Sequence, residues 1–256
     1  MRIVIATLLT VLAFASCRPK LVWSDEFNNN GAPDSSKWNY DLGANNGWGN
    51  NEQQAYTRLP QNVRIENGNL IIEAHRDSTE GKPYSSARIV SKGKGDWLYG
   101  RIEVRAKLPY GRGTWPAIWM LSTDWEYGGW PASGEIDIME HVGYNPDSVF
   151  GTIHTEAYNH IKQTHKSGPI ALPDAAEQFH IYGINWTENK IEFFVDDTHY
   201  YTVNKSKSDT YKEWPFDKRF HLLMNLAVGG NWGGKMGIDE SIWPQKMEVD
   251  YVRVYQ

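Results

Sequence analysis

The sequence predicts an all-β protein built as a β-sandwich. Short segments of strand-like composition recur along the chain, and turn signals such as Asn67-Gly68 and Asp196-Asp197 separate them. Helical periodicity is nearly absent, apart from one short turn expected near residues 173–178. With 256 residues, 40% of them hydrophobic, the chain can bury a full core as one large β domain. Many short strands joined by polar loops therefore favour two stacked sheets.

The expected strands follow one another to the C-terminus without an internal repeat, a low-complexity tract or a linker to a second domain. β-Branched and aromatic residues mark each strand, and polar or glycine-rich turns, such as residues 110–113, end it. The predicted strands are residues 63–74, 87–91, 100–107, 118–121, 135–140, 150–154, 180–186, 190–195, 199–203, 220–226 and 246–255.

The N-terminus is expected to be a targeting segment rather than part of the fold. A charged Met1-Arg2 precedes an apolar run that is too short to span a bilayer, and Cys17 follows it. This order resembles a bacterial lipoprotein signal, with residues 1–16 removed and Cys17 carrying the lipid. Cys17 is the only cysteine, so no disulfide forms within the chain. Residues 17–20 are the expected tether and 21–256 the folded domain, exported and anchored to a membrane, with the outer membrane expected.

The most informative segment is GEIDIME at residues 134–140. Alternation of acids with large apolar residues suits a strand with one face in the core and one facing a polar space. Glu135 and Asp137 share a face, whereas Glu140 joins them only if one extra residue is inserted before it. A β-bulge at Ile138-Met139 does this. The sequence therefore predicts three acids in a row on one strand face.

Such a triplet fits the hydrolysis of a glycosidic bond by two carboxylates. With the bulge, Glu135 and Glu140 stand four ladder steps apart, about 13 Å between Cα atoms. Side chains leaning together leave a gap compatible with the ~5–5.5 Å of a retaining enzyme. Glu135 is the expected nucleophile, Glu140 the general acid and then base, and Asp137 the residue that orients Glu135. The alternative is an exposed acidic strand over core residues, because structural networks also perturb acids.

The motif GEIDIMEHVG at residues 134–143 resembles the catalytic signature of glycoside hydrolase family 16, in the bulged form of its laminarinase-like β-1,3-glucanases. Other blocks occur in the order that this family shows, from about residue 21 to the C-terminus: WSDEF (23–27), GWGNNEQQ (47–54), WPAIWML (115–121), GTIHT (151–155), NLAVGGNWGG (225–234) and VDYVRVY (249–255). The resemblance implies a β-jelly-roll whose concave inner sheet forms the cleft, and an endo-acting, retaining enzyme on laminarin-type glucans.

The chain is rich in aromatic residues that suit a carbohydrate cleft, with 12 Trp and 14 Tyr, although any single Trp could equally be core. Trp115 and Trp119 would share a strand face, and the resemblance places them against sugars near the cleavage point. It also gives Asn50 and Arg88 hydrogen bonds to sugar hydroxyls, where a turn Asn and a surface salt-bridge Arg are the alternatives. Trp232, between glycines, is expected to be a mobile stacking platform.

Histidines near the acids leave two readings open. His154 could face the cleft and contact Glu140, or it could be a satisfied core histidine. His154, His160 and His165 are spaced by six and five residues, which match no common ligand pattern, so a catalytic zinc is not expected.

No cofactor is expected for catalysis. The resemblance does imply a structural calcium ion away from the cleft, held by oxygens of Glu26, Gly68 and Asp250, with backbone carbonyls providing much of the binding.

The net charge of −5 gives no basic footprint for nucleic acid, so a neutral polysaccharide is the expected partner. A monomer is the default state. Two rival functions stay open. One is a preference for mixed-linkage β-1,3-1,4-glucan, against which the bulged motif leans, and the other is a non-catalytic glucan-binding jelly roll, against which the three intact acids argue.

Overall fold

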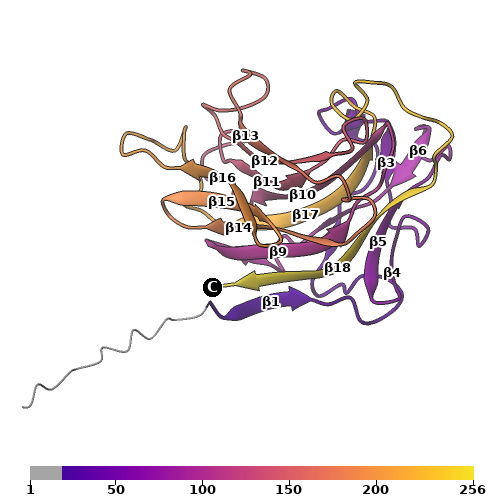
Figure 1. The fold of residues 1–256 in the computed structure, drawn as a ribbon, viewed down its shortest axis with the longest axis horizontal. Coiled ribbons are helices and arrows are strands. Elements are labelled where there is room, and N and C mark those ends of the chain that lie inside the picture. The colour runs from indigo at the N-terminus through magenta and orange to yellow at the C-terminus, as the bar shows by residue number, and fades with distance from the viewer. Residues whose placement is uncertain (1–18) are drawn as a thin grey trace, which may run out of the picture.

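Two curved antiparallel sheets stack face to face and form the body of the molecule (Figure 1). The structure is a computed structural model that describes residues 19–256. The predicted signal segment and Cys17 lie outside the described residues, and the predicted tether 17–20 lies partly outside them. The prediction of an all-β sandwich of two antiparallel sheets is confirmed. In residues 19–256, no helical segment has the length and apolar character needed to cross a membrane.

The first sheet has the strand order β16-β15-β14-β9-β18-β5-β4, and β1 also pairs with β18. Its strands are β1 (Leu21–Asp25), β4 (Val63–Glu66), β5 (Asn69–Ala74), β9 (Gly100–Lys107), β14 (His180–Trp186), β15 (Lys190–Val195), β16 (Thr198–Asn204) and β18 (Gln245–Tyr255).

The second sheet has the order β13-β12-β11-β10-β17-β7-β2, with β8 paired to β17. A separate two-stranded parallel sheet joins β3 to β6, and one 3-10 helix, η1, lies before β3. These elements are β2 (Asn39–Tyr40), η1 (Asn45–Gly47), β3 (Gln54–Tyr56), β6 (Tyr84–Ser86), β7 (Arg88–Val90), β8 (Asp96–Trp97), β10 (Thr114–Ser122), β11 (Glu135–Glu140), β12 (Ser148–His154), β13 (Lys166–Ala171) and β17 (Phe220–Val228).

The core lies between the two sheets and follows from strand alternation. On β9 the inward residues Ile102, Val104 and Ala106 are fully buried, and on β10 Ile118 and Met120 are buried from the other side. Burying each large aliphatic side chain contributes about 1.5–3 kcal/mol relative to leaving it exposed. The inner face of the second sheet is thereby fixed in the core, which leaves its outer face free to carry a site.

Strand bounds agree with the predictions where alternation is strict. Four predicted strands, 100–107, 135–140, 180–186 and 190–195, coincide with β9, β11, β14 and β15. The Asn67-Gly68 signal also forms the predicted turn between β4 and β5, with φ of +53° and +78°. The segment 173–178 forms turns, as expected.

β10 starts at Thr114, earlier than the predicted 118, because Pro116 is accommodated inside it. The Pro116 carbonyl accepts a bond from the His141 N–H at 3.3 Å, so its ring nitrogen points to that side too. β11 has ended there, at Glu140 opposite Ala117, so no ladder bond is lost. β13, which was not predicted, contains Gly168 and Pro169 and lies at the sheet edge, where proline is tolerated.

Candidate active site

The acid strand β11 lies between β10 and β12 and contains the predicted bulge. Across β10, Asp137 pairs with Trp119 and Met139 pairs with the next residue, Ile118, so Ile138 is the extra residue. The pairing with β12 shifts over the same interval, between Asp137 and Glu140. The prediction of a bulge at Ile138-Met139 is confirmed.

The bulge separates the side chains of β11 into two sets. Ile138 and Met139 are both buried in the core between the sheets. Glu135, Asp137 and Glu140 all line the cleft on the outer face. Three carboxyl groups therefore lie along one strand face.

Register also fixes the spacing of the two glutamates. Glu135 lies opposite Leu121 and Glu140 opposite Ala117 on β10. The partners are four residues apart on an unbroken strand, so the Cα atoms of the glutamates are about 13 Å apart, as predicted.

The three carboxyl groups hold their protons more strongly than free acids do. Burial raises the pKa of Glu135 to about 7, although hydrogen bonds from Asp137 and Trp130 oppose the rise. Burial and the charge of Glu135 raise the pKa of Glu140 to about 8. Burial and both glutamate charges raise the pKa of Asp137 well above its usual value. Asp137 therefore stays protonated and donates to Glu135, which is the first of the three to ionise.

Each glutamate also receives one indole N–H. The Trp130 Nε1–H donates to Glu135 Oε2 at 2.7 Å, and the Trp115 Nε1–H donates to Glu140 Oε1 at 3.1 Å. Trp130 comes from the loop before β11 and Trp115 from β10. Because a donor favours the charged form of its acceptor, each indole offsets part of the effect of burial.

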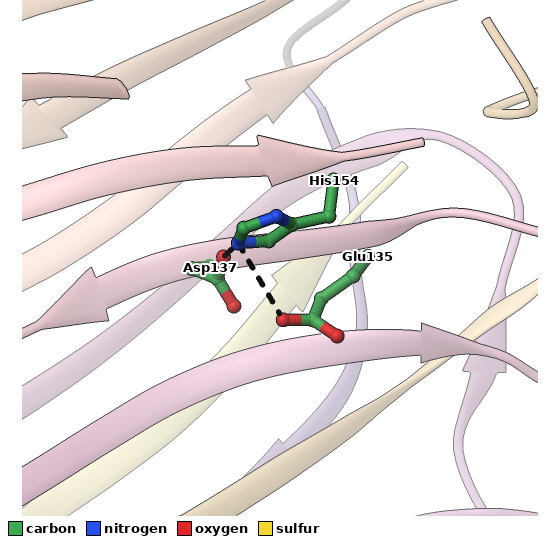
Figure 2. A group of neighbouring side chains, drawn as sticks. All are labelled: Glu135, Asp137 and His154. Carbon is green, nitrogen blue, oxygen red and sulfur yellow. Dashed lines mark ion pairs between the residues drawn. The ribbon is translucent and has the colours of Figure 1, made fainter. Parts of the chain in front are cut away.

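His154 lies over the start of the acid strand (Figure 2). Its Nε2 is 3.4 Å from Asp137 Oδ2 and 4.0 Å from Glu135 Oε1. Burial and the neighbouring imidazoles of His160 and His165 lower the pKa of His154 to about 3, so the ring is neutral. Of the two alternatives for His154, it faces the cleft, but it contacts Asp137 and Glu135 instead of Glu140, because the β11–β12 register pairs His154 with Glu135.

The cleft encloses about 600 Å³ over the outer face of the second sheet. Trp115 and Trp119 project into it from the same face of β10, as predicted, because β10 pairs with β17 without a bulge. Trp232 also lines the cleft, and its ring packs edge-on against Trp115 at 5.7 Å and Phe150 at 5.4 Å. Trp232 therefore lies where it can meet a sugar, and its mobility stays a prediction.

Arg88 is more enclosed than a surface salt-bridge residue. Its guanidinium lies 4.9 Å from the Trp48 ring and 4.6 Å from the Trp119 ring, and its Nε is 3.0 Å from Asp41 Oδ2. Stacking on both rings keeps the flat group in one orientation at the cleft wall. Asn50 lines the same cleft, with its Nδ2 3.4 Å from a Glu52 oxygen.

Several residues that line the cleft were not assigned to it from the sequence, among them Trp48, Glu52, His160 and His165, nor was Trp130, which bonds Glu135 beside them. No periodicity marks them, because most lie in irregular segments. Trp130 could have been suspected, because it is a large aromatic residue in the polar, glycine-rich segment directly before β11.

The residues expected around calcium are separate from the cleft. Both carboxylate oxygens of Glu26 accept hydrogen bonds from the Arg253 guanidinium, at 3.0 and 2.8 Å. Asp250 Oδ2 is 2.6 Å from Arg105 Nη1. Because arginines already pair with both carboxylates, a cation there would depend on backbone carbonyls such as that of Gly68. Calcium stays a prediction.

The family follows from a match over most of the chain. The family model described as Glycosyl hydrolases family 16 covers residues 50–253. The chain belongs to glycosyl hydrolase family 16.

Relatives of this family 16 domain cover nearly its whole length. It is 54% identical over 244 residues to a beta-glucanase of Rhodothermus marinus, covering 93% of this chain and 85% of that protein. The laminarinase structure from Rhodothermus marinus superposes with a TM-score of 0.91 at 54% identity, covering 93% and 97%. A non-specific endo-β-1,3(4)-glucanase of family 16, SCLam, co-crystallised with 1,3-β-D-cellotriosyl-glucose, gives 0.90 at 47% identity, covering 94% and 95%.

Proposed function

We propose that this family 16 enzyme is an endo-acting β-1,3-glucanase that hydrolyses laminarin-type glucans with retention of configuration. One observation carries the proposal: Glu135 and Glu140 lie on the same strand face, with a buried Asp137 between them, in a cleft lined by tryptophans. The similarity to the Rhodothermus laminarinase supports the choice of substrate.

In this mechanism Glu140 gives its proton to the glycosidic oxygen while the Glu135 carboxylate attacks the anomeric carbon. A covalent glycosyl-enzyme forms as the aglycone leaves. Glu140, now a carboxylate, then takes a proton from the water that breaks the ester and releases Glu135. The order of the pKa values supports these roles, because Glu140, at about 8, keeps its proton longer than Glu135, at about 7.

Asp137 serves the pair as a positioning residue in this proposal. Its proton hydrogen-bonds Glu135, which favours the ionised nucleophile and fixes its rotamer. Because Asp137 keeps its proton, the strand face does not gain a third charge. That limits the electrostatic cost of burying three acids together.

The deciding experiment measures reducing sugar released from laminarin, lichenan and agarose by the full chain. Laminarin is the expected best substrate, with short oligosaccharides as early products, and proton NMR should detect the β-anomer first. Glu135→Ala should abolish hydrolysis while the circular dichroism spectrum stays unchanged. Wild-type activity in that variant would refute Glu135 as nucleophile, and binding of laminarin without sugar release would favour the non-catalytic glucan-binding reading.

Mixed-linkage glucan is the second candidate substrate. SCLam is described as a non-specific endo-β-1,3(4)-glucanase and is 47% identical to this chain. A kcat/KM on lichenan above that on laminarin would favour this reading.

We also propose that the enzyme is an exported, monomeric lipoprotein anchored through Cys17, with the outer membrane as the expected location. The charged start, the apolar run and the position of the only cysteine support the anchor. Wild-type protein should incorporate radiolabelled palmitate and sediment with membranes, whereas Cys17→Ser should do neither. Release of Cys17→Ser as a dimer on size-exclusion chromatography would contradict the expected monomer.

A further inference from the structure

Beside Glu135, the cleft holds a group of possible metal ligands: a carboxylate oxygen of Glu135, one of Asp137 and a ring nitrogen of His154. We propose that Glu135, Asp137 and His154 form a binding site for a divalent transition-metal ion of the Zn²⁺ type, and that this ion inhibits the enzyme reversibly. The binding site stands on the geometry alone, whereas the inhibition rests on the proposed function.

The donor atoms already lie close to the spacing that a small ion needs (Figure 2). One ligand atom from each of the three side chains lies within 4.8 Å of the other two. Zinc bonds of about 2.0–2.2 Å in a tetrahedron place neighbouring donors about 3.4 Å apart. His154 Nε2 and Asp137 Oδ2 are 3.4 Å apart, and Nε2 and Glu135 Oε1 are 4.0 Å apart. A small side-chain rotation of Glu135 closes the remaining gap.

A second observation points to a ligand at this place. Asp137 is 2% exposed, and its Oδ2 has no hydrogen-bond partner among residues 19–256. A buried carboxyl oxygen without a partner is costly. The facing Nε2 of His154 belongs to a neutral ring, so its lone pair is available to a metal when the proton is on Nδ1. A cation between the two atoms would satisfy both.

The donor set selects the class of ion. Zinc accepts both imidazole nitrogen and carboxylate oxygen, and three protein ligands with a fourth position open to the cleft are the number that catalytic zinc sites use. Ca²⁺ and Mg²⁺ prefer more oxygen ligands and are disfavoured by the nitrogen. On binding, any protons on the two carboxyl groups pass to solvent, and the ion takes their place.

Inhibition follows from which group the ion occupies. A Glu135 oxygen bonded to zinc is not free to attack the anomeric carbon, and the ion stands where the sugar would lie. Glucan and zinc should therefore compete for the cleft.

The test begins with isothermal titration of the full chain with ZnCl₂ in the absence of glucan. Wild type should bind one ion per chain at the cleft. His154→Ala and Asp137→Asn should each weaken binding at least tenfold, since each removes one of three protein ligands; the Asn variant also keeps the size of the side chain. His199→Ala is the matched control, because His199 lies on β16 in the other sheet, beside Thr202. Circular dichroism confirms the fold of each variant.

His160 and His165 supply the competing explanation, since their rings lie 5.3 and 5.7 Å from that of His154. A combined His160→Ala and His165→Ala variant should keep the zinc site. Loss of binding in that variant, unchanged binding in His154→Ala, or no binding to wild type at millimolar zinc would each overturn the proposal.

The inhibition has a separate readout. Zinc should slow laminarin hydrolysis, and EDTA should restore it. Added oligosaccharide should raise the zinc concentration needed for half-maximal inhibition. Tight zinc binding that leaves hydrolysis unchanged would refute the inhibition. Zinc binding by a chain that does not hydrolyse any glucan would refute the proposed function and leave the metal site standing.

Discussion

Replacing Trp130 with Phe removes the indole N–H that donates to Glu135 Oε2 at 2.7 Å and keeps an aromatic ring beside His160. A hydrogen bond to a charged group contributes about 1.5–3 kcal/mol. One pKa unit corresponds to about 1.4 kcal/mol, so the loss should raise the pKa of Glu135 by about 1–2 units from its value of about 7. The direction is upward because the lost donor favoured the ionised form.

The assay is the pH dependence of kcat/KM on laminarin, whose acidic limb reports ionisation of the nucleophile in the free enzyme. That limb should move to higher pH by about 1–2 units in Trp130→Phe. Below the limb, activity scales with the ionised fraction, so the variant should be about 10- to 100-fold slower than wild type. Activity near the alkaline side should change less.

Trp115→Phe is the matched control, because it removes the donor to Glu140 instead. It should raise the pKa of Glu140 above about 8 and move the alkaline limb to higher pH. Because the two glutamates interact, each limb of the pH profile reflects the pair and not one residue. Comparing the two variants shows which glutamate dominates each limb. An acidic limb that stays in place in Trp130→Phe, or identical shifts in both variants, would refute the reasoning.

Deleting Met139 restores regular alternation from Glu135 to Glu140, so Glu140 stays on the cleft face but loses the bulge that now sets its direction. The deletion should reduce laminarin hydrolysis or change the preference between laminarin and lichenan; an unchanged profile on both glucans would contradict the role of the bulge. Arg88→Lys should raise KM for laminarin about tenfold with a smaller change in kcat, because an ammonium cannot stack as a plane between Trp48 and Trp119; a fall in kcat alone would count against a binding role. Gly134→Ala should lower the free energy of unfolding by about 1–3 kcal/mol, because φ is +86° and a Cβ would lie 2.8 Å from Pro215. Thermal unfolding should show a Tm several degrees lower, and Gly129→Ala, whose Cβ would have no neighbour within 4 Å, should unfold like wild type.

The sequence predicted the acid strand well because its information is local. Three acids at odd and even positions can share one face only through an inserted residue, so the bulge follows from counting. Strands such as β9 and β14 kept their predicted bounds because their alternation is strict. β1 and β13 were missed because each lies at a margin of its sheet, where few side chains must be buried.

The residues that contact the acids could not be predicted from the sequence in the same way. Trp130 reaches Glu135 from an irregular loop, and His154 meets Glu135 rather than Glu140 because of a register between two strands. His160 and His165 approach His154 although their spacing in the sequence suggested no common site. Loop paths and register depend on the whole packed structure, so no local pattern encodes them.

The bulge in β11 has a genetic consequence. Side chains alternate along a strand, so losing one residue at 138–139 would remove the bulge and leave Glu140 on the cleft face, whereas gaining one residue there would turn Glu140 to the other face. No single-nucleotide substitution can do this, because it exchanges one side chain and leaves the count of residues unchanged. The face on which the acid lies is therefore robust to ordinary point mutation and vulnerable to an in-frame gain of one codon. Libraries meant to alter it must vary length at residues 138–139.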